Sequence, residues 1–582
     1  MGKVNDYINK LIGFIKNEKP ENKEKPWLKY YGDVPESLNY FNGSMYDYLK
    51  DTASKNEKRS AYSFYGNEVT FKSFMKKIDK VASALKEFNI VENECVTICM
   101  PNTPEGLISF YAASKIGAIS NMIHPLSAEE EIKDYLIMTK SKFLVVVDFC
   151  YEKVKNIISE TEVRKVIVVP VSNSMLAHMQ LGYKLKTWKM KKPRRSKLYM
   201  YWNDFMLRSY FNDFEENKAL AEDPAVILHS GGTTGKPKGI VLSNGNFNAL
   251  ALQARVIFKD LKPGDKVLGI MPIFHGFGLG VSFHIPFGLG CEVILVPQFN
   301  AKKFDELLDK YKPNVICGVP TLYEALINTK NKNLDLSMLK YVISGGDSLS
   351  SNLTERINDF LKEHGSRVKV SQGYGMTEAL AAVALSFGEA YRDGSIGIPF
   401  PGNYIKIVTP GTQDEVPYGE DGEICVSGPT VMLGYLNDER ETNEMLQKHK
   451  DGAIWLHTGD IGMMNENGII YYRQRLKRMI ISSGYNVYPS YVEKVIEEHP
   501  AVLKCSVIGI PHPYKVEVPK AYIVLKDGYS PLMVKGGIKE HCKKNLAVYS
   551  IPHEFVYRKS LPKTLMGKID FKKLQEAEDE EE

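Results

Sequence analysis

Residue types suited to binding an anion are concentrated between Leu228 and Gly239, in the sequence LHSGGTTGKPKG. The apolar run 225–228 predicts a buried strand, so the glycines begin where that strand ends. Glycine lets the backbone approach a ligand, its N–H groups can converge on an anion, and hydroxyl and ammonium groups add donors. This combination predicts a phosphate-binding loop. The alternative is a flexible surface loop, which does not explain why threonines and lysines cluster behind a strand.

The loop differs from the Walker A sequence. That motif begins with glycine and places Ser or Thr after its lysine, where the hydroxyl binds Mg²⁺. Here Ser230 stands in the first place and Pro237 follows Lys236. The Mg²⁺-binding hydroxyl of a P-loop kinase is therefore missing.

Three further strand patterns run into glycine turns, at 315–320, 341–346 and 368–378. Ligands of open α/β sheets bind where strands end in such turns, so we expect one shared cleft. Between Ser44 and Cys150, strand patterns alternate with helical ones, which predicts parallel α/β layers.

The stretch 267–291 contains no Asp, Glu, Lys or Arg and has the length of a membrane span. Its six glycines, its two prolines, His275 and His284 favour a buried strand–loop–helix passage near a ligand.

The composition excludes several classes of protein. A chain of 582 residues is expected to form more than one domain. A net charge of +5 gives little counterion release, so we expect no nucleic-acid partner. Eight cysteines without a CxxC pair favour a reducing compartment, and no secretory signal pattern is present, so a cytoplasmic location is expected.

Two segments could lie on the inner membrane surface as peripheral contacts. Residues 4–15 have apolar side chains at helical spacing, although docking on the protein itself is the favoured interpretation. Residues 184–197 contain eight basic and no acidic residues, and aromatic residues are interleaved or follow as far as Trp202. Anionic lipid and a solvated loop with inward-packed aromatics remain equal alternatives for this segment.

Taken in order, these stretches resemble the adenylate-forming superfamily of acyl-CoA synthetases, luciferases and peptide-synthetase adenylation domains, from about Ser44 to Leu574. That family uses ATP to convert a carboxylate to an acyl-adenylate and pyrophosphate, and most members pass the acyl group to a thiol.

The resemblance implies an α/β fold class. A large N-terminal domain of layered α/β subdomains plus a β-rich subdomain is followed by a small mobile α+β C-terminal domain. The implied parts are 1–43, an N-terminal helix and connector; 44–474, the AMP-binding (adenylation) domain, with a basic aromatic insertion at about 175–208; 475–478, the hinge; 479–575, the mobile domain; and 576–582, a solvated acidic tail.

The resemblance also implies ATP, Mg²⁺ and CoA as cofactors and gives residues for the nucleotide. The residues implied to bind the β- and γ-phosphates are Ser230, Gly231, Thr233, Thr234, Gly235 and Lys238. Thr377 contacts the α-phosphate and Glu378 is the metal ligand, both following Gly373, Tyr374, Gly375 and Met376. Adenine lies against Gly345, Gly346 and Asp347, and ribose is held by Asp460 and Arg475.

In the C-terminal region, Lys568 matches the adenylation lysine, which bridges the attacking carboxylate and the α-phosphate. Lys477 matches the hinge, about which the small domain rotates so that Lys568 is exchanged for a thiol tunnel beside Ser483, Gly484 and Tyr485. The chain departs from the family pattern at four positions, which are Gln474, Arg478, Ser483 and Met566.

Residues implied beside the acyl group are His275, Phe277, Gly278 and Gly318. No Asp is present in 272–278 to hold an ammonium, so we do not expect an amino acid as the substrate. We expect an acyl-CoA synthetase for a medium- or long-chain fatty acid. The alternatives are an aryl or sterol-type acid, a carrier-protein phosphopantetheine as acceptor, and a nucleotide-binding sensor without ligase activity.

Overall fold

The computed structural model describes residues 25–208, 219–231, 237–482, 485–512, 515–563 and 569–579. The chain divides into two compact units, Met1–Ile405 with Val426–Leu456, and Lys406–Cys425 with His457–Glu582. It passes from one unit to the other within the strands β17 (Tyr404–Val408), β18 (Asp421–Ser427) and β21 (Ile454–Met464).

One sheet of the first unit has the strand order β19-β9-β8-β4-β3-β5-β6-β7 among the described residues. Its pairs from β8 to β7 are parallel, whereas β9 is antiparallel to both of its neighbours. The bounds are β3 (Cys95–Cys99), β4 (Ile119–Met122), β5 (Phe143–Val147), β6 (Lys165–Val169), β7 (Tyr199–Tyr201), β8 (Pro224–Gly231), β9 (Pro237–Ser243) and β19 (Gly434–Tyr435).

A second sheet of this unit has the order β16-β15-β14-β13-β12-β10-β11-β1-β2 in the described part. The pairs from β14 to β1 are parallel and the strands at both edges are antiparallel. The bounds are β1 (Ser60–Phe64), β2 (Asn67–Thr70), β10 (Lys266–Gly269), β11 (Glu292–Leu295), β12 (Val315–Gly318), β13 (Tyr341–Ser344), β14 (Val370–Tyr374), β15 (Ala384–Leu385) and β16 (Ile398–Pro399).

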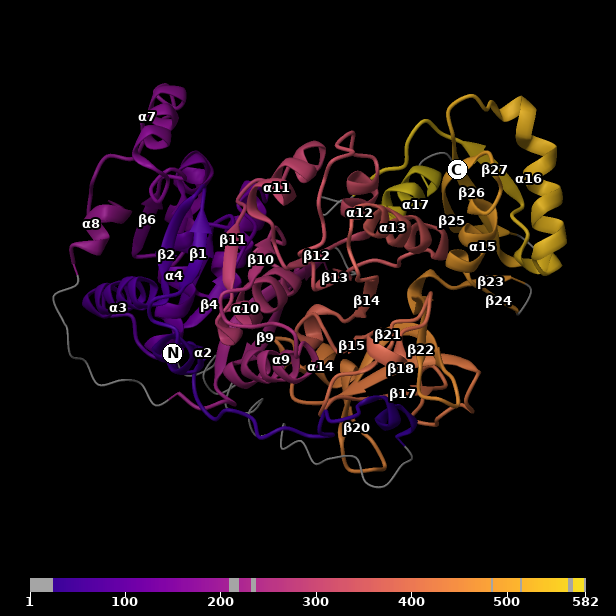
Figure 1. Cartoon of the computed structure of the whole chain (residues 1–582), viewed down its shortest axis with the longest axis horizontal. Helices are drawn as coiled ribbons and strands as arrows, with labels where there is room; N and C mark the ends of the chain where they lie inside the picture. The colour runs from indigo at the N-terminus through magenta and orange to yellow at the C-terminus, as the bar shows by residue number, and fades with distance from the viewer. Residues whose placement is uncertain are drawn as a thin grey trace. The chain divides into compact units, whose positions relative to one another are not determined.

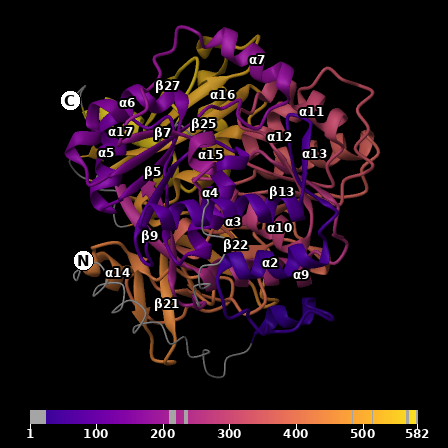
Figure 2. The same cartoon turned by 90° about the vertical axis from the view of Figure 1, so that its left-hand side faces the viewer.

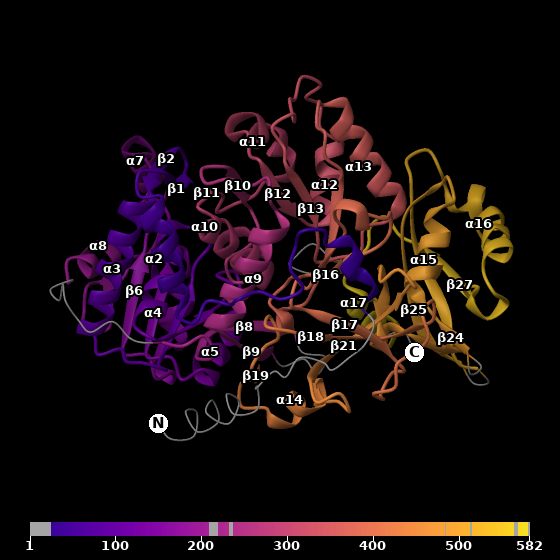
Figure 3. The same cartoon turned by 60° about the horizontal axis from the view of Figure 1, so that its bottom comes forward.

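A layer of helices lies between these two sheets (Figures 1 and 3). Helix α4 contacts β3 and β4, α3 contacts β1 and β2, and the two helices pack on each other. Similarly, α9 contacts β8 and β9, and α10 contacts both α9 and β11. The layer comprises α2 (Met45–Lys55), α3 (Phe71–Glu87), α4 (Pro104–Lys115), α9 (Asn244–Ile257) and α10 (Ile285–Leu289).

The sequence of α4 suits a position between two sheets. From Pro104 to Ser114 every residue is buried, and the segment carries one acidic side chain, Glu105. Oε1 of that carboxylate accepts hydrogen bonds from Ser174 and Asn173, which compensates part of the cost of burial. A helix that is apolar around its whole circumference is stable only when it is covered on all sides.

Other helical segments of this unit include η1 (Pro26–Tyr30), α5 (Glu129–Met138), η2 (Asp148–Cys150), α6 (Tyr151–Ile157), η3 (Ile158–Glu160), α7 (Ala177–Lys186), α8 (Trp202–Met206), the π-helical η4 (Phe277–His284), η5 (Ala301–Lys303), α11 (Phe304–Tyr311), α12 (Pro320–Ile327), α13 (Ser351–Glu363), η6 (Thr377–Ala379), η7 (Gly388–Ala390) and α14 (Glu439–Met445). Strand β20 (Leu446–Lys448) pairs with the part of β21 that belongs to this unit.

Asn102 fixes the chain that leaves β10. Its side-chain N–H groups donate to the carbonyl oxygens of Gly269 and Met271 at 3.1 Å, and its oxygen accepts from the N–H of Ile273 at 3.0 Å. One buried amide therefore satisfies backbone groups that have left the sheet ladder. These bonds hold the start of the segment 272–278 against the end of β3.

In the second unit, a sheet of the order β24-β23-β26-β25, with β27 beside β26, carries helices on both faces. Neighbouring residues of β26 belong to different cores: Ile523 packs with α15 and α16, and Tyr522 with Leu574 of α17. This is the alternation expected of a strand with two covered faces. The bounds are β22 (Ile470–Arg475), η8 (Leu476–Arg478), β23 (Ile480–Ser482), β24 (Tyr485–Val487), α15 (Pro489–Glu497), β25 (Val502–His512), β26 (Val516–Leu525), α16 (Pro531–Asn545), η9 (Val548–Ser550), β27 (Glu554–Tyr557) and α17 (Phe571–Asp579).

The acidic C-terminus differs from the solvated tail that its composition suggests. Helix α17 continues to Asp579, and Glu578 accepts hydrogen bonds from Lys520 and from the hydroxyl of Tyr522. Here a buried lysine of β26 requires an anionic partner, which composition alone does not reveal.

The alternation of strands and helices confirms the predicted α/β class. The uncharged stretch 267–291 forms the end of β10, η4 and α10, as expected of a strand–loop–helix passage. Within the described part of the chain, no helix has the length and apolarity needed to cross a membrane.

Candidate functional site

The predicted phosphate loop is the tip of a β-hairpin. Strands β8 and β9 are antiparallel, and Ser230 is the cross-strand partner of Lys238. Residues 232–236, which include Thr233, Thr234 and Gly235, lie outside the described residues, as does the environment of Gly231. The hairpin therefore holds Ser230 and Lys238 side by side at the base of the loop.

Lys238 has an anion and an aromatic ring as neighbours. Its ammonium forms an ion pair with Glu441 of α14 and lies 5.2 Å from the centroid of the Tyr435 ring. Tyr435 is adjacent because β19 pairs with β9, so that Tyr435 faces Ile240 across the ladder. Only 15% of the Lys238 side chain is exposed, and a cation buried to this extent requires such compensation.

The same tyrosine contacts the predicted metal ligand. Its hydroxyl donates to Oε1 of Glu378 at 2.9 Å, and the Glu378 carbonyl accepts from the N–H of Met432 at 2.8 Å. Glu378 lies in η6, directly after β14, and is buried. Tyr435 thus connects two predicted site residues, Lys238 and Glu378, which are 140 positions apart in the sequence.

The turn that carries Thr377 and Glu378 is unusually tight. Leu380 and Ala381 both have positive φ, +46° and +71°, which non-glycine residues adopt only under constraint. A Cβ on Gly375 would lie 2.0 Å from the carbonyl oxygen of Ala381. Glycine at 375 is therefore required for the chain to fold back.

The predicted adenine and acyl residues lie together. A Cβ on Gly345 would lie 3.4 Å from the Phe277 ring, and one on Gly346 would lie 4.0 Å from it. The N–H of Gly345 donates to the carbonyl of Gly318 at 2.9 Å. Asp347, by contrast, is exposed and accepts a hydrogen bond from the N–H of Ser348.

The segment 272–278 lies close to the turn after β14. A Cβ on Gly276 would lie 3.5 Å both from Ala381 and from Leu228 at the start of the predicted phosphate loop. The Nδ1 of His275 accepts from the N–H of Phe277 at 3.2 Å, so this histidine shapes its own turn. Strand ends from both sheets therefore meet in the first unit, as the glycine turns predicted.

His229, next to Ser230, is a neutral residue. Burial lowers the pKa of His229 to about 3, because the charged form would lose its hydration. Its Nε2 lies 2.6 Å from Oδ1 of Asn121, an acceptor, so Nε2 carries the proton. The base of the hairpin is thus anchored by a neutral hydrogen bond, and the charge there comes from Lys238.

The predicted ribose residues form a pair in the second unit. Asp460 and Arg475 are cross-strand partners of β21 and β22, with 3.0 Å between Arg475 Nε and Asp460 Oδ1. Asp460 is 1% exposed, whereas about half of the Arg475 side chain is exposed. The arginine supports a buried carboxylate and still reaches solvent.

Two departures from the family pattern are accommodated near the predicted hinge. The Arg478 guanidinium pairs with Glu493 of α15 at 2.5 Å and stacks on Phe571 of α17. Gln474 is fully buried and accepts from the N–H of Ser490. Lys477 lies between them in η8, while Ser483, Gly484, Lys568 and the Tyr485 side chain lie outside the described part.

Comparison with known proteins identifies the family. Residues 49–436 match the model of the AMP-binding enzyme family, and residues 491–568 match the model of its C-terminal domain. The chain belongs to the AMP-binding enzyme family. The predicted superfamily and fold class are therefore confirmed.

Similar members of the AMP-binding family span nearly the whole chain. A long-chain-fatty-acid–CoA ligase from Bacillus subtilis is 32% identical over 577 residues, which cover 96% of this chain and 99% of that protein. A probable 4-coumarate–CoA ligase from Dictyostelium discoideum is 31% identical over 510 residues, 86% of this chain and 88% of that protein. Among solved structures, an anthranilate CoA ligase with anthranoyl-AMP has a TM-score of 0.81 at 26% identity, covering 94% of this chain and 99% of that one.

The sequence did not single out Tyr435 and Glu441. Tyr435 lies in a two-residue strand, and Glu441 lies in the short helix α14, where an acidic residue in the first turn is ordinary. They could have been found only by asking which residues compensate the partly buried Lys238 and the buried Glu378.

Replacing Gly375 by alanine is expected to weaken ATP binding about tenfold or more, because overpacking of this kind costs about 1–3 kcal/mol and must open the turn. Isothermal titration calorimetry measures the affinity. The control is Gly536→Ala on α16, where the added Cβ would meet no atom within 4 Å outside the helix's own backbone in the described structure. Equal ATP affinities of the two variants would contradict the proposed constraint.

Replacing Tyr435 by phenylalanine removes the hydrogen bond to Glu378 and keeps the ring beside Lys238. Partners of metal ligands typically contribute about 10–100-fold in metal affinity, so half-maximal activity should require at least about tenfold more Mg²⁺. The control is Tyr31→Phe, which also loses a buried 2.9 Å hydrogen bond, to the carbonyl of Pro399. A Mg²⁺ requirement that rises equally in both variants would show that Tyr435 has no specific effect.

Proposed function

We propose that the chain is an AMP-forming acid–CoA ligase that activates a medium- or long-chain fatty acid with ATP and transfers the acyl group to CoA. The observation that carries this proposal is the similarity to the Bacillus subtilis long-chain-fatty-acid–CoA ligase over 96% of the chain. The carboxylate attacks the α-phosphate and displaces pyrophosphate, so the site must neutralise negative charge without supplying a nucleophile.

The first unit offers charge of both signs for the polyphosphate. The Lys238 ammonium can donate hydrogen bonds to phosphate oxygens, with Ser230 beside it on the hairpin. Glu378 fits Mg²⁺ because a carboxylate is a hard oxygen ligand, and Tyr435 fixes its orientation. When bound, Mg²⁺ would reduce the charge of the phosphates and orient them for displacement.

The second unit offers residues for ribose and for the reacting carboxylate. A buried carboxylate such as Asp460 can accept hydrogen bonds from both ribose hydroxyls, and Arg475 holds it in place. Lys568 is proposed to bind the attacking carboxylate and the α-phosphate, since a compact ammonium has several donors. Lys477 is proposed as the hinge between adenylation and transfer to CoA.

The acyl region supports an apolar substrate. Residues 267–291 contain no Asp, Glu, Lys or Arg, and η4 is buried throughout. Burial lowers the pKa of His284 to about 3, and its Nδ1 lies 3.0 Å from the Tyr111 hydroxyl, so it remains neutral. An ammonium or a second carboxylate on the acid would find no counter-ion in this segment.

An aryl acid is the second candidate, because the 4-coumarate and anthranilate ligases are also similar to this chain. A carrier protein as acceptor is a third, and CoA-dependent turnover without any carrier protein distinguishes it. A nucleotide-binding sensor is disfavoured, because Glu378, Asp460 and Lys568 are all present.

A panel of acids tests the substrate, with CoA-dependent AMP release as the measurement. For saturated fatty acids, kcat/KM should rise about fourfold per added methylene until the site is filled, since each buried CH₂ contributes about 0.8 kcal/mol. A hydroxycinnamic or aminobenzoic acid that exceeds every fatty acid would establish the aryl alternative.

The Lys568→Ala variant serves as the control for that panel. It should lose acid-dependent ATP–pyrophosphate exchange and still form thioester from supplied acyl-adenylate. Equal loss of both steps would contradict the role proposed for Lys568.

Helix α7 and the turn after it are proposed to contact anionic lipid. Leu181 and Leu185 lie one turn apart and are 60% and 68% exposed, and Trp188 is 72% exposed. The helix is held on the protein by the Tyr183 hydroxyl, which donates to Asp148 at 3.0 Å. Figures 1 and 2 show α7 projecting at the edge of the first unit.

The other aromatic residues between 184 and 202 are less exposed than Trp188. Trp202 is buried, and Tyr199 contacts the ring of Tyr151 edge-on. The proposed lipid-facing part is therefore α7 and the turn after it, not the whole of residues 184–202. It combines exposed apolar side chains with basic ones, which suits an anionic interface. The segment 4–15 lies outside the described residues.

Flotation with vesicles of phosphatidylcholine and phosphatidylglycerol tests this contact. The double variant Leu185→Gln/Trp188→Gln should bind at least about tenfold more weakly, because each buried apolar side chain contributes about 1.5–3 kcal/mol. The control is Leu532→Gln/Met533→Gln on α16, where both side chains are also exposed. Equal binding of the wild type and the α7 variant would refute the contact.

A further inference from the structure

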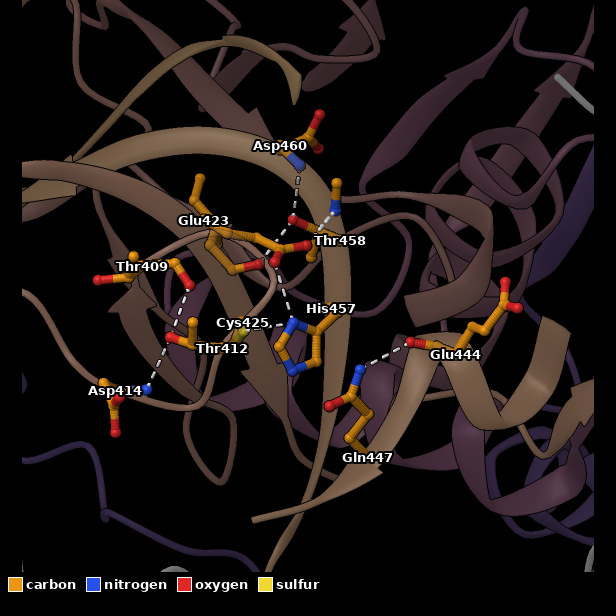
Figure 4. Close-up of polar contacts among 12 residues, drawn as sticks. Thr409, Thr412, Asp414, Glu423, Cys425, Glu444, Gln447, His457, Thr458 and Asp460 are labelled. Atoms are coloured by element: carbon orange, nitrogen blue, oxygen red, sulfur yellow. Dashed lines mark hydrogen bonds and ion pairs between the residues drawn. The ribbon is translucent and has the colours of Figure 1, made fainter. Parts of the chain in front are cut away.

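Three side chains with chemically active groups lie buried together in the second unit (Figure 4). Glu423 and Cys425 are on β18, two positions apart and therefore on one face of the strand, and His457 is on β21. Glu423 Oε2 lies 2.9 Å from His457 Nδ1, and Cys425 Sγ lies 3.6 Å from the same nitrogen. No role assigned above uses this cluster.

The second oxygen of Glu423 holds the backbone next to the proposed ribose ligand. Its Oε1 accepts a hydrogen bond of 2.9 Å from the N–H of Gly459, directly before Asp460. Gly459 has φ +65°, so the strand kinks there in a conformation that favours glycine. Glu423 thus bonds to both His457 and Gly459, two residues of the same turn.

A second set of bonds ties this turn to β18. The Thr458 hydroxyl donates to the carbonyl of Ile424 at 2.6 Å and accepts from the N–H of Asp460 at 3.1 Å. Figure 4 shows the Asp460 carboxylate pointing away from the Glu423–His457 pair. The kink therefore directs the buried Asp460 side chain away from this pair, while hydrogen bonds to β18 fix the residues before it.

We propose that Glu423 is a positioning residue for ribose: by accepting from His457 and from Gly459 at once, it holds the kink that orients Asp460. The proposal rests on the ribose-binding role proposed for Asp460. A carboxylate is suited to this task because it has two acceptor oxygens and no donor. An amide offers one acceptor only, and turns its N–H₂ group towards one of the two donors.

A metal ion is the competing interpretation of the same cluster, which presents one oxygen, one sulfur and one nitrogen within 4.8 Å. The hydrogen bonds already account for both oxygens of Glu423 and for the proton on His457 Nδ1. Burial, followed by the charge of Glu423, raises the pKa of the Cys425 thiol well above its ordinary value. The Cys425 thiol contacts His457 Nδ1 but takes part in neither hydrogen bond of Glu423, so replacing it separates the two interpretations.

The experiment compares the affinity of the full-length enzyme for ATP, 2′-deoxy-ATP and 3′-deoxy-ATP. A hydrogen bond from ribose to a charged group corresponds to about tenfold or more in affinity, so the wild type should prefer ATP by that factor. Asp460→Asn should lose most of this preference. Glu423→Ala should lose it as well, through weaker ATP binding with unchanged binding of the deoxynucleotides, and Glu423→Gln should fall between.

Cys425→Ala is the matched control, a buried substitution on the same strand that leaves both bonds of Glu423 in place. It should keep the full preference for ATP. The zinc content of the purified proteins is measured by elemental analysis. If Glu423→Ala does not fold, Glu423→Gln still tests the positioning role.

Each outcome has a distinct meaning. Loss of preference in the Glu423 variants alone, with Cys425→Ala unaffected, supports the positioning role. Full preference in both Glu423 variants, while Asp460→Asn has lost it, overturns that role and leaves the proposed function intact. Full preference in Asp460→Asn refutes the ribose assignment itself. Stoichiometric zinc that is lost in Cys425→Ala together with the preference would replace the hydrogen-bond mechanism by a metal site.

Discussion

The contact between Tyr435 and Glu378 is the interaction on which the first unit's site depends. The polyphosphate site proposed above needs a carboxylate and an ammonium that do not pair with each other. Tyr435 contacts both groups. Its hydroxyl donates to Glu378, and its ring centroid lies 5.2 Å from the Lys238 ammonium. Glu441 supplies the lysine with a counter-ion at the edge of the site. The neutral Tyr435 side chain thereby contacts both Glu378 and Lys238 and leaves their charges unchanged.

The second unit solves a related problem in another way. Asp460 is nearly inaccessible, and a buried carboxylate is tolerated only with compensating partners. Arg475 supplies charge across the β21–β22 ladder, and Glu423 shapes the backbone on the other side of the residue. Both units therefore place an acidic side chain at the end of a constrained turn, after Gly375 in one and after Gly459 in the other. In both cases the backbone conformation of the turn determines where the acidic side chain lies.

Much of the fold could be predicted from the sequence, because apolar runs such as 143–147 and glycine turns such as 341–346 are local signals. Which strand ends meet also follows from the general behaviour of α/β sheets. The partners of site residues could not be predicted, since Tyr435 and Glu378 are brought together by the pairing of β19 with β9. The paired Glu578 was missed for the same reason: its partner Lys520 lies 58 positions away. Long-range pairing carries no local signature.

Some glycines of the proposed site are required by the fold, and others are not. Gly278 and Gly375 are required by the fold, because a Cβ there would lie 1.9 Å and 2.0 Å from a carbonyl oxygen. Gly345 is not: its φ is ordinary, and a Cβ would make a contact of 3.4 Å with Phe277. Since packing does not demand glycine at 345, this residue agrees with the proposal that a flat adenine ring lies against the backbone there. A glycine that the fold does not need is thus stronger support for a binding role than one that it does.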